Sequence, residues 1–119
     1  MSLQAYQKTQ RNTENTKQTE YRLFAQVTQA LVEAAKHGKA NITGLIDALD
    51  WNRRMWSALA SDCASQGNQL PPAVRAQIVS LSLWVSRYSS DAAQKGASLE
   101  PLIDVNKSIM AGLSQRPAA

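Results

Sequence analysis

The sequence predicts an all-α fold: a compact antiparallel bundle of about four helices, with a polar N-terminal tail or helix extension. Apolar residues recur at intervals of three and four over four stretches, the periodicity of amphipathic helices. Gly38, Gly67 and Gly96 separate these stretches, and glycine commonly follows the end of a helix. Each helix would have one apolar face to bury, and antiparallel packing with short connections satisfies all four.

The polar segment lies at the N-terminus, over residues 1–18. It is rich in Gln, Thr, Asn and Lys, and its apolar anchors are Leu3 and Tyr6, too few to offset the entropy of ordering the chain. The remainder of the 119 residues has the usual size of one domain. We therefore expect a single helical domain over 19–114 and a flexible end over 115–119.

The first predicted helix begins near Thr19 and ends at Gly38. Its apolar stripe consists of Phe24, Val27, Leu31 and Ala34 or Ala35. His37 lies in the last turn, where positive charge suits the helix dipole. Because the chain has no second histidine, we expect no metal-binding or catalytic role for it.

The second predicted helix begins after Asn41 or Thr43, both good N-cap residues, and runs to about Ser65. Its stripe consists of Leu45, Leu49, Asn52, Trp56, Leu59 and Cys63. A buried amide without a hydrogen-bond partner costs about 1–3 kcal/mol. We therefore interpret Asn52 as a structural amide that hydrogen-bonds between helices, the alternative being a role in binding. Cys63 is expected to be a small core residue.

The third and fourth predicted helices follow turn signals. Leu70-Pro71-Pro72 starts the third, because proline is tolerated in a first helical turn, and Gly96 ends it. Ser98 is a suitable N-cap for the fourth, with Glu100 in its first turn. Asn106 is a second structural amide on an apolar stripe. The third stripe is Val74, Ile78, Leu81, Val85, Tyr88 and Ala92, and the fourth is Leu99, Leu102, Ile103, Asn106, Ile109, Met110 and Leu113.

Composition restricts location and partners. With 44% hydrophobic and 18% charged residues the chain is globular, and no apolar run approaches the roughly 18 residues that would span a bilayer. The N-terminus lacks a secretory signal, and the lone Cys63 fits a reducing compartment, so we expect a cytoplasmic protein without membrane association.

The net charge of +4 is spread along the chain, with Arg53-Arg54 its one adjacent basic pair, which argues against direct nucleic-acid binding.

The sequence lacks the motifs of enzymes and of cofactor or metal binding. It has no glycine-rich phosphate loop, no Cys and His at metal-ligand spacing and no G-x-S-x-G. The spacing of Asp47 and Asp50 allows both on one helix face, but such carboxylate pairs are usually solvated. We therefore expect a binding protein that is not an enzyme and needs no cofactor.

Six residues are candidates for binding a partner protein, because large apolar side chains and arginine are common at interfaces. For the tryptophans and methionines at helical spacing the alternative is the bundle core. Trp51 lies off the stripe of its helix and is the best candidate for an exposed anchor. The candidates are Trp51, Arg54, Met55, Trp56, Trp84 and Met110.

Three motifs occur in order along the chain. The second helix contains N-R-x-x-W at Asn52, Arg53 and Trp56, the third contains S-L-x-L-W-V over 80–85, and the last reads L-I-x-V-N-x-x-I-x-x-G-L over 102–113. Over about residues 20–113 these motifs resemble the bacterial FlaF family. Val105 replaces the isoleucine of that family's last motif and Lys107 replaces a common arginine, which preserves shape and charge.

The resemblance implies a role in flagellum biogenesis, in which the family links flagellin synthesis to flagellin export. From it we expect an export chaperone that binds flagellin and shields the amphipathic terminal helices of unassembled subunits. The alternative is a regulator of flagellin translation that acts through the regulator FlbT or, with less support from the charge pattern, on flagellin messenger RNA.

Overall fold

The computed structural model describes residues 3–115, including the side chains of Leu3 and of residues 20–112. Its elements are α1 (Leu3–His37), the short 3-10 helix η1 (Gly38–Asn41), α2 (Ile42–Ala64), α3 (Pro72–Lys95) and α4 (Glu100–Gln115). The described part of the chain contains no strand. The predicted all-α class is therefore confirmed.

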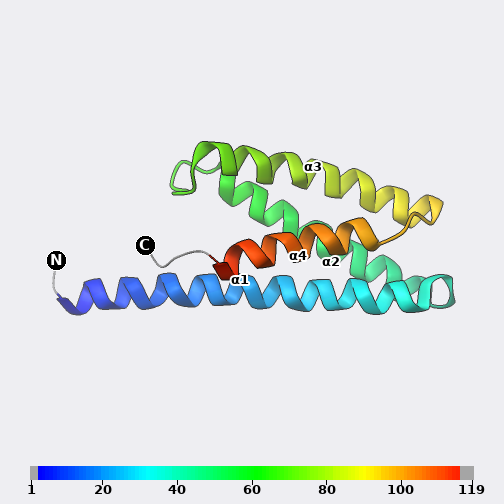
Figure 1. Cartoon of the computed structure of the whole chain (residues 1–119), viewed down its shortest axis with the longest axis horizontal. Coiled ribbons are helices and arrows are strands. Elements are labelled where there is room, and N and C mark those ends of the chain that lie inside the picture. The colour runs from blue at the N-terminus through cyan, green and yellow to red at the C-terminus, as the bar shows by residue number, and fades with distance from the viewer. Residues whose placement is uncertain (1–2, 116–119) are drawn as a thin grey trace.

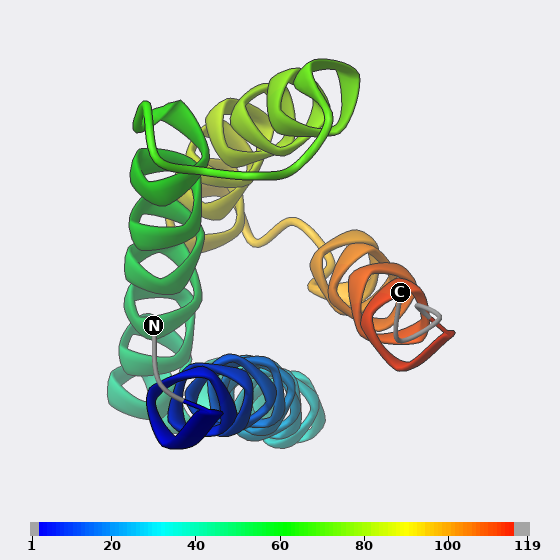
Figure 2. The same cartoon turned by 90° about the vertical axis from the view of Figure 1, so that its left-hand side faces the viewer.

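The chain direction alternates from one long helix to the next, as Figure 1 shows. Seen along the long axis in Figure 2, α3 and α1 lie at the top and bottom, α2 runs down one side between them, and α4 lies on the other side. α2 packs against both α1 and α3, and α4 packs against α1. The molecule measures 57 × 24 × 21 Å, and α1 determines its long dimension (Figure 1).

Helix α1 includes most of the polar N-terminal segment. The helix begins at Leu3, not near Thr19, so the segment is a helix extension and not a tail. No glycine or proline occurs between residues 3 and 37. Once the apolar half docks on the bundle, the helix can grow toward the N-terminus without a new nucleation step. Leu3 is 71% exposed, and the side chain of the other predicted anchor, Tyr6, lies outside the described set.

The predicted helix boundaries agree closely with the structure after residue 37. Asn41 is the N-cap of α2, and its Oδ1 accepts a hydrogen bond from the backbone N–H of Gly44 at 3.0 Å. Gly96 follows α3 with φ +71°, the left-handed conformation that glycine adopts most readily. The Ser98 Oγ accepts from the Glu100 N–H at 3.2 Å. Thr43, the alternative cap of the second helix, lies inside α2.

The core is formed by one face of each long helix, as the apolar stripes predict. Trp56 lies at its centre, fully buried, with its ring 5.8 Å from that of Phe24 in a T-shaped contact at 86°. The predicted frayed end, 115–119, lies outside the described residues except for Gln115. The buried apolar residues are Phe24, Val27, Leu31, Ala34, Ala48, Leu49, Met55, Trp56, Cys63, Ile78, Val85, Ala92, Leu99 and Leu102.

Candidate functional site

The two predicted structural amides hydrogen-bond to each other inside the core. Asn106 on α4 donates from Nδ2 to Oδ1 of Asn52 on α2 at 2.8 Å, and its own Oδ1 accepts from Nε1 of Trp56 at 2.8 Å. All three side chains are 0% exposed. This buried chain of hydrogen bonds links α2 to α4, as expected for amides that fix the relative position of two helices.

The indole of Trp56 determines the orientation of both amides. An indole N–H can only donate, so the Asn106 oxygen must face it and the Asn106 nitrogen must face Asn52. Asn52 then presents its oxygen to Asn106, and its Nδ2 is left buried without a hydrogen-bond partner. The arrangement therefore contains one unsatisfied donor inside the core.

The partner-binding candidates separate by burial. Met55 and Trp56 are 7% and 0% exposed and belong to the core, so they present no surface to a partner in this conformation. Trp84 and Met110 are half-buried and pack against the core. Trp84 stacks obliquely on Tyr88, with ring centroids 5.2 Å apart, and the Met110 sulfur accepts from the Thr28 hydroxyl at 3.8 Å.

Trp51 is the candidate that lies beside an open pocket. Its side chain is 37% exposed and forms part of the wall of a pocket between the C-terminal end of α1 and the N-terminal end of α2. We call this the α1–α2 pocket; its volume is about 290 Å³. Its lining combines small side chains with acidic and polar ones: Ala30, Glu33, Ala34, His37, Asn41, Gly44, Asp47, Ala48 and Trp51.

Two carboxylates, those of Glu33 and Asp47, line the α1–α2 pocket, although the chain as a whole is basic. Glu33 is held by Lys36 at 3.2 Å and by Gln29 at 3.1 Å on the surface of α1. Asp47 makes no ion pair with any residue that the structure describes. His37, predicted at the end of the first helix, is the last residue of α1 and also lines this pocket.

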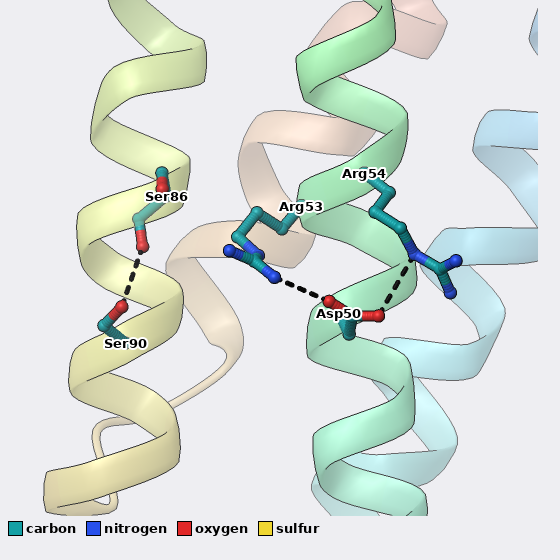
Figure 3. Close-up of polar contacts among 5 residues, drawn as sticks. All are labelled: Asp50, Arg53, Arg54, Ser86 and Ser90. Carbon is teal, nitrogen blue, oxygen red and sulfur yellow. Dashed lines mark hydrogen bonds and ion pairs between the residues drawn. The ribbon is translucent and has the colours of Figure 1, made fainter.

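A second pocket lies on the opposite face of α2. We call it the α2–α3 pocket; its volume is about 250 Å³. Asp50 on α2 pairs with two guanidinium groups, that of Arg53 at 2.7 Å and that of Arg54 at 3.1 Å, as Figure 3 shows. The pocket is lined by Ile46, Leu49, Asp50, Arg53, Ser89, Ser90, Ala93 and Gln94.

The two arginines differ in position. Arg53 extends toward α3 and lines the α2–α3 pocket, whereas the partner-binding candidate Arg54 extends to the other side of Asp50 (Figure 3). The hydrogen bond from Arg53 lowers the pKa of Asp50 below its ordinary value, and the charges of both arginines act in the same direction. Asp50 is therefore ionised at neutral pH.

The sequence did not indicate the buried hydroxyl of Ser89. Its side chain is 4% exposed, and its Oγ has no hydrogen-bond partner. Ser89 lies four residues after Val85 and three before Ala92, on the buried face of α3, and on the same helix the Ser82 hydroxyl donates to the Trp56 carbonyl of α2 at 3.3 Å. The one signal in the sequence is the i, i+4, i+7 and i+8 recurrence of serine on the third helix, at Ser82, Ser86, Ser89 and Ser90.

The described residues contain no group of three or more His, Cys, Asp or Glu side chains placed to hold a metal ion. Among the same residues, no helix has the length and apolar character needed to cross a membrane.

Cys63 is 1% exposed and is not part of either pocket. Burial raises the pKa of its thiol, which favours the unreactive protonated form.

Comparison with protein families matches residues 2–113 to the family described as flagellar protein FlaF. No curated protein and no solved structure shows significant similarity to the chain. The match covers nearly the whole chain and includes the three motifs that form the Asn52–Asn106–Trp56 core and the α2–α3 contact. The chain therefore belongs to the FlaF family of flagellar proteins.

Proposed function

We propose that this protein is a cytoplasmic export chaperone for flagellin, not an enzyme, and that it couples flagellin synthesis to secretion. The observation that supports this proposal best is the α1–α2 pocket, which places Trp51 at the surface beside a floor of small side chains. Membership of the FlaF family supports the flagellar context.

The shape of the α1–α2 pocket suits an apolar helix face. Ala30, Ala34 and Ala48 leave room between α1 and α2, and the exposed indole of Trp51 offers a large, rigid contact area. Tryptophan is among the residues that contribute most to binding when they sit beside a cleft. A partner helix that placed two or three apolar side chains in this pocket would cover the indole and exclude water from it.

Unassembled flagellin supplies an occupant of this kind. From the family resemblance we infer that its terminal helices are amphipathic and bury their apolar faces only in the filament. In the cytoplasm, such faces promote aggregation and premature assembly. Shielding them until export is the mechanism that we propose for the coupling of synthesis to secretion.

Direct action on messenger RNA receives less support from the site. The exposed aromatic residue of the α1–α2 pocket, Trp51, has Glu33 and Asp47 as neighbours, and carboxylates repel phosphate. RNA recognition usually combines exposed aromatic side chains with basic ones. Binding to FlbT is the regulatory alternative that the experiment below distinguishes.

The test is size-exclusion chromatography with light scattering on the purified protein mixed with monomeric flagellin, and separately with FlbT, at about 50 and 200 mM salt. We expect a flagellin complex that persists at the higher salt concentration, because apolar contacts are little screened. The variant Trp51→Ala should weaken it at least about tenfold. Leu83→Ala removes another exposed apolar side chain, 59% exposed and outside both pockets, and should leave the affinity unchanged.

Two results would contradict the chaperone proposal. In one, flagellin elutes alone while FlbT co-elutes, which would make the protein a regulator. In the other, removal of the terminal helices of flagellin leaves its affinity for the protein unchanged.

A further inference from the structure

The α2–α3 pocket is a second surface with its own chemistry. Its α2 residues, among them Ile46 and Arg53, face away from those that line the α1–α2 pocket, because the two sets lie on opposite sides of the helix. A ligand in the α1–α2 pocket therefore leaves this surface free. Its wall on the α3 side consists of small and polar side chains.

Hydrogen-bond donors from both helices line the pocket beside the Asp50 carboxylate. Arg53 contributes a half-exposed guanidinium from α2. From α3, Ser89 contributes a buried hydroxyl that has no partner, and Gln94 contributes an amide. The neighbouring Ser90 hydroxyl donates to the Ser86 carbonyl at 3.3 Å (Figure 3). Donors that surround one space from two helices favour an acceptor group of a ligand.

The ion pairs around Asp50 leave positive charge available. Two guanidinium groups share one carboxylate, so Asp50, Arg53 and Arg54 together carry a net charge of +1, with Asp50 and Arg53 in the pocket wall and Arg54 beside it. If Arg53 turned toward a ligand, Arg54 would continue to neutralise Asp50 from the other side (Figure 3). Arg53 can therefore exchange an internal carboxylate for an external one without leaving Asp50 unpaired.

An apolar strip leads into the pocket along α2. Ile46 lines the pocket and is 42% exposed, and Ile42, one turn earlier on the same face, is 53% exposed. Side chains four residues apart on a helix lie next to each other. The surface thus combines an apolar strip with an arginine at a distance of about two helical turns from Ile46, since residues 46 and 53 are seven apart.

We propose that the α2–α3 pocket docks an acidic amphipathic helix of a protein partner, whose carboxylate pairs with Arg53 and whose apolar side chains cover Ile42 and Ile46. The charge complementarity identifies the occupant as acidic, and the strip identifies it as amphipathic. A phosphate group would use Arg53 alone and would leave both isoleucines uncovered. This second docking site is independent of the proposed binding of flagellin.

The test uses two designed helical peptides that present the same leucine face and differ only by Glu or Gln at one flanking position. Each is titrated into the full-length protein, with affinity measured by calorimetry and the contact surface by backbone amide NMR shifts. We expect the Glu peptide to bind about tenfold more tightly than the Gln peptide, and the shifts to centre on Ile46, Ser89 and Ser90.

Arg53→Gln and Arg54→Gln form a matched pair, because both arginines pair with Asp50 and only Arg53 lines the pocket. Arg54→Gln should preserve the preference for the Glu peptide, and Arg53→Gln should reduce it below about twofold. Ile46→Ser should weaken both peptides equally, whereas Leu83→Ser should weaken neither. Unchanged circular dichroism and melting temperature confirm that each variant is folded.

The proposal is overturned if neither peptide binds at about millimolar concentration, if both bind equally to the wild type, if Arg54→Gln abolishes the preference as Arg53→Gln does, or if the shifts lie elsewhere. A parallel titration with monomeric flagellin separates the two proposals. If flagellin does not bind, the chaperone proposal is contradicted. The peptide titration still decides whether the α2–α3 pocket is a docking site.

Discussion

At the residue scale, one buried chain of hydrogen bonds relates two distant parts of the sequence. Trp56 donates to Asn106, and Asn106 donates to Asn52, across a separation of 50 residues or more. A leucine core would tolerate sliding of α4 along α2, whereas these bonds are satisfied only in one register. The cost is the unsatisfied Nδ2 of Asn52.

We predict that Asn106→Leu destabilises the protein more than Asn52→Leu. Loss of Asn106 leaves two buried groups unpaired, the Trp56 N–H and the Asn52 oxygen, at about 1–3 kcal/mol each. Loss of Asn52 leaves only the Asn106 nitrogen unpaired and also removes a donor that already lacked a partner. Urea unfolding of both variants measures the difference, and equal losses would show that the bonds do not control stability.

The buried thiol of Cys63 predicts a pH dependence. Burial raises its pKa in the folded protein above the ordinary value of 9.0. As pH rises through that ordinary value, the unfolded chain loses the thiol proton first, so ionisation favours unfolding and stability falls. Cys63→Ala removes this effect. The difference in unfolding free energy between wild type and variant should therefore shrink from pH 8 to pH 10, and a constant difference would contradict it.

At the element scale, the helix ends follow local chemistry. Asn41 caps α2 at its start, and at its end the Arg75 guanidinium donates from Nε to the Cys63 carbonyl at 2.6 Å. A positive charge beside the last carbonyls of a helix stabilises its negative end. Arg75 belongs to α3, so this contact also joins α2 to α3. The sequence predicts the Asn41 cap but not the Arg75 contact, because only the tertiary fold brings Arg75 to the end of α2.

Two glycines should respond in opposite ways to alanine. Gly96 has φ +71°, which a Cβ disfavours, so Gly96→Ala should destabilise the protein by about 1 kcal/mol. Gly112 lies within α4, and a Cβ there would meet nothing within 4 Å, so Gly112→Ala should stabilise by about 0.5–1 kcal/mol. Thermal unfolding compares both variants with the wild type. If the two substitutions changed the stability in the same direction, the assigned backbone conformations would be contradicted.

At the scale of the whole molecule, the N-terminal part of α1 projects beyond the other helices (Figure 1). A helical segment without tertiary contacts depends on its own marginal stability. We therefore predict that deletion of residues 1–18 changes the free energy of unfolding by less than about 1 kcal/mol while it lowers the helical circular dichroism signal. Chemical denaturation checks this, and a loss of several kcal/mol would show that the extension packs on the bundle.

The sequence by itself determined which residues form the helices after residue 37 and which faces they bury. It could do so because caps, prolines, glycines and apolar periodicity act over a few residues, as at Asn41, Pro72 and Gly96. It also singled out Asn52 and Asn106, because amides on apolar stripes need partners. It placed the start of the first helix too late, because the polar composition of 1–18 hid the absence of any residue that breaks a helix.

Only the tertiary structure decided which candidates are core and which are surface. Trp51 and Met55 both lie off the predicted apolar stripe of α2, yet Trp51 is 37% exposed and Met55 is 7% exposed. That difference depends on the neighbours that α1, α3 and α4 bring to each side of α2. The α2–α3 pocket and the unpartnered hydroxyl of Ser89 depend on the same packing, because burial and clefts are properties of contacts between segments distant in sequence, which local patterns do not contain.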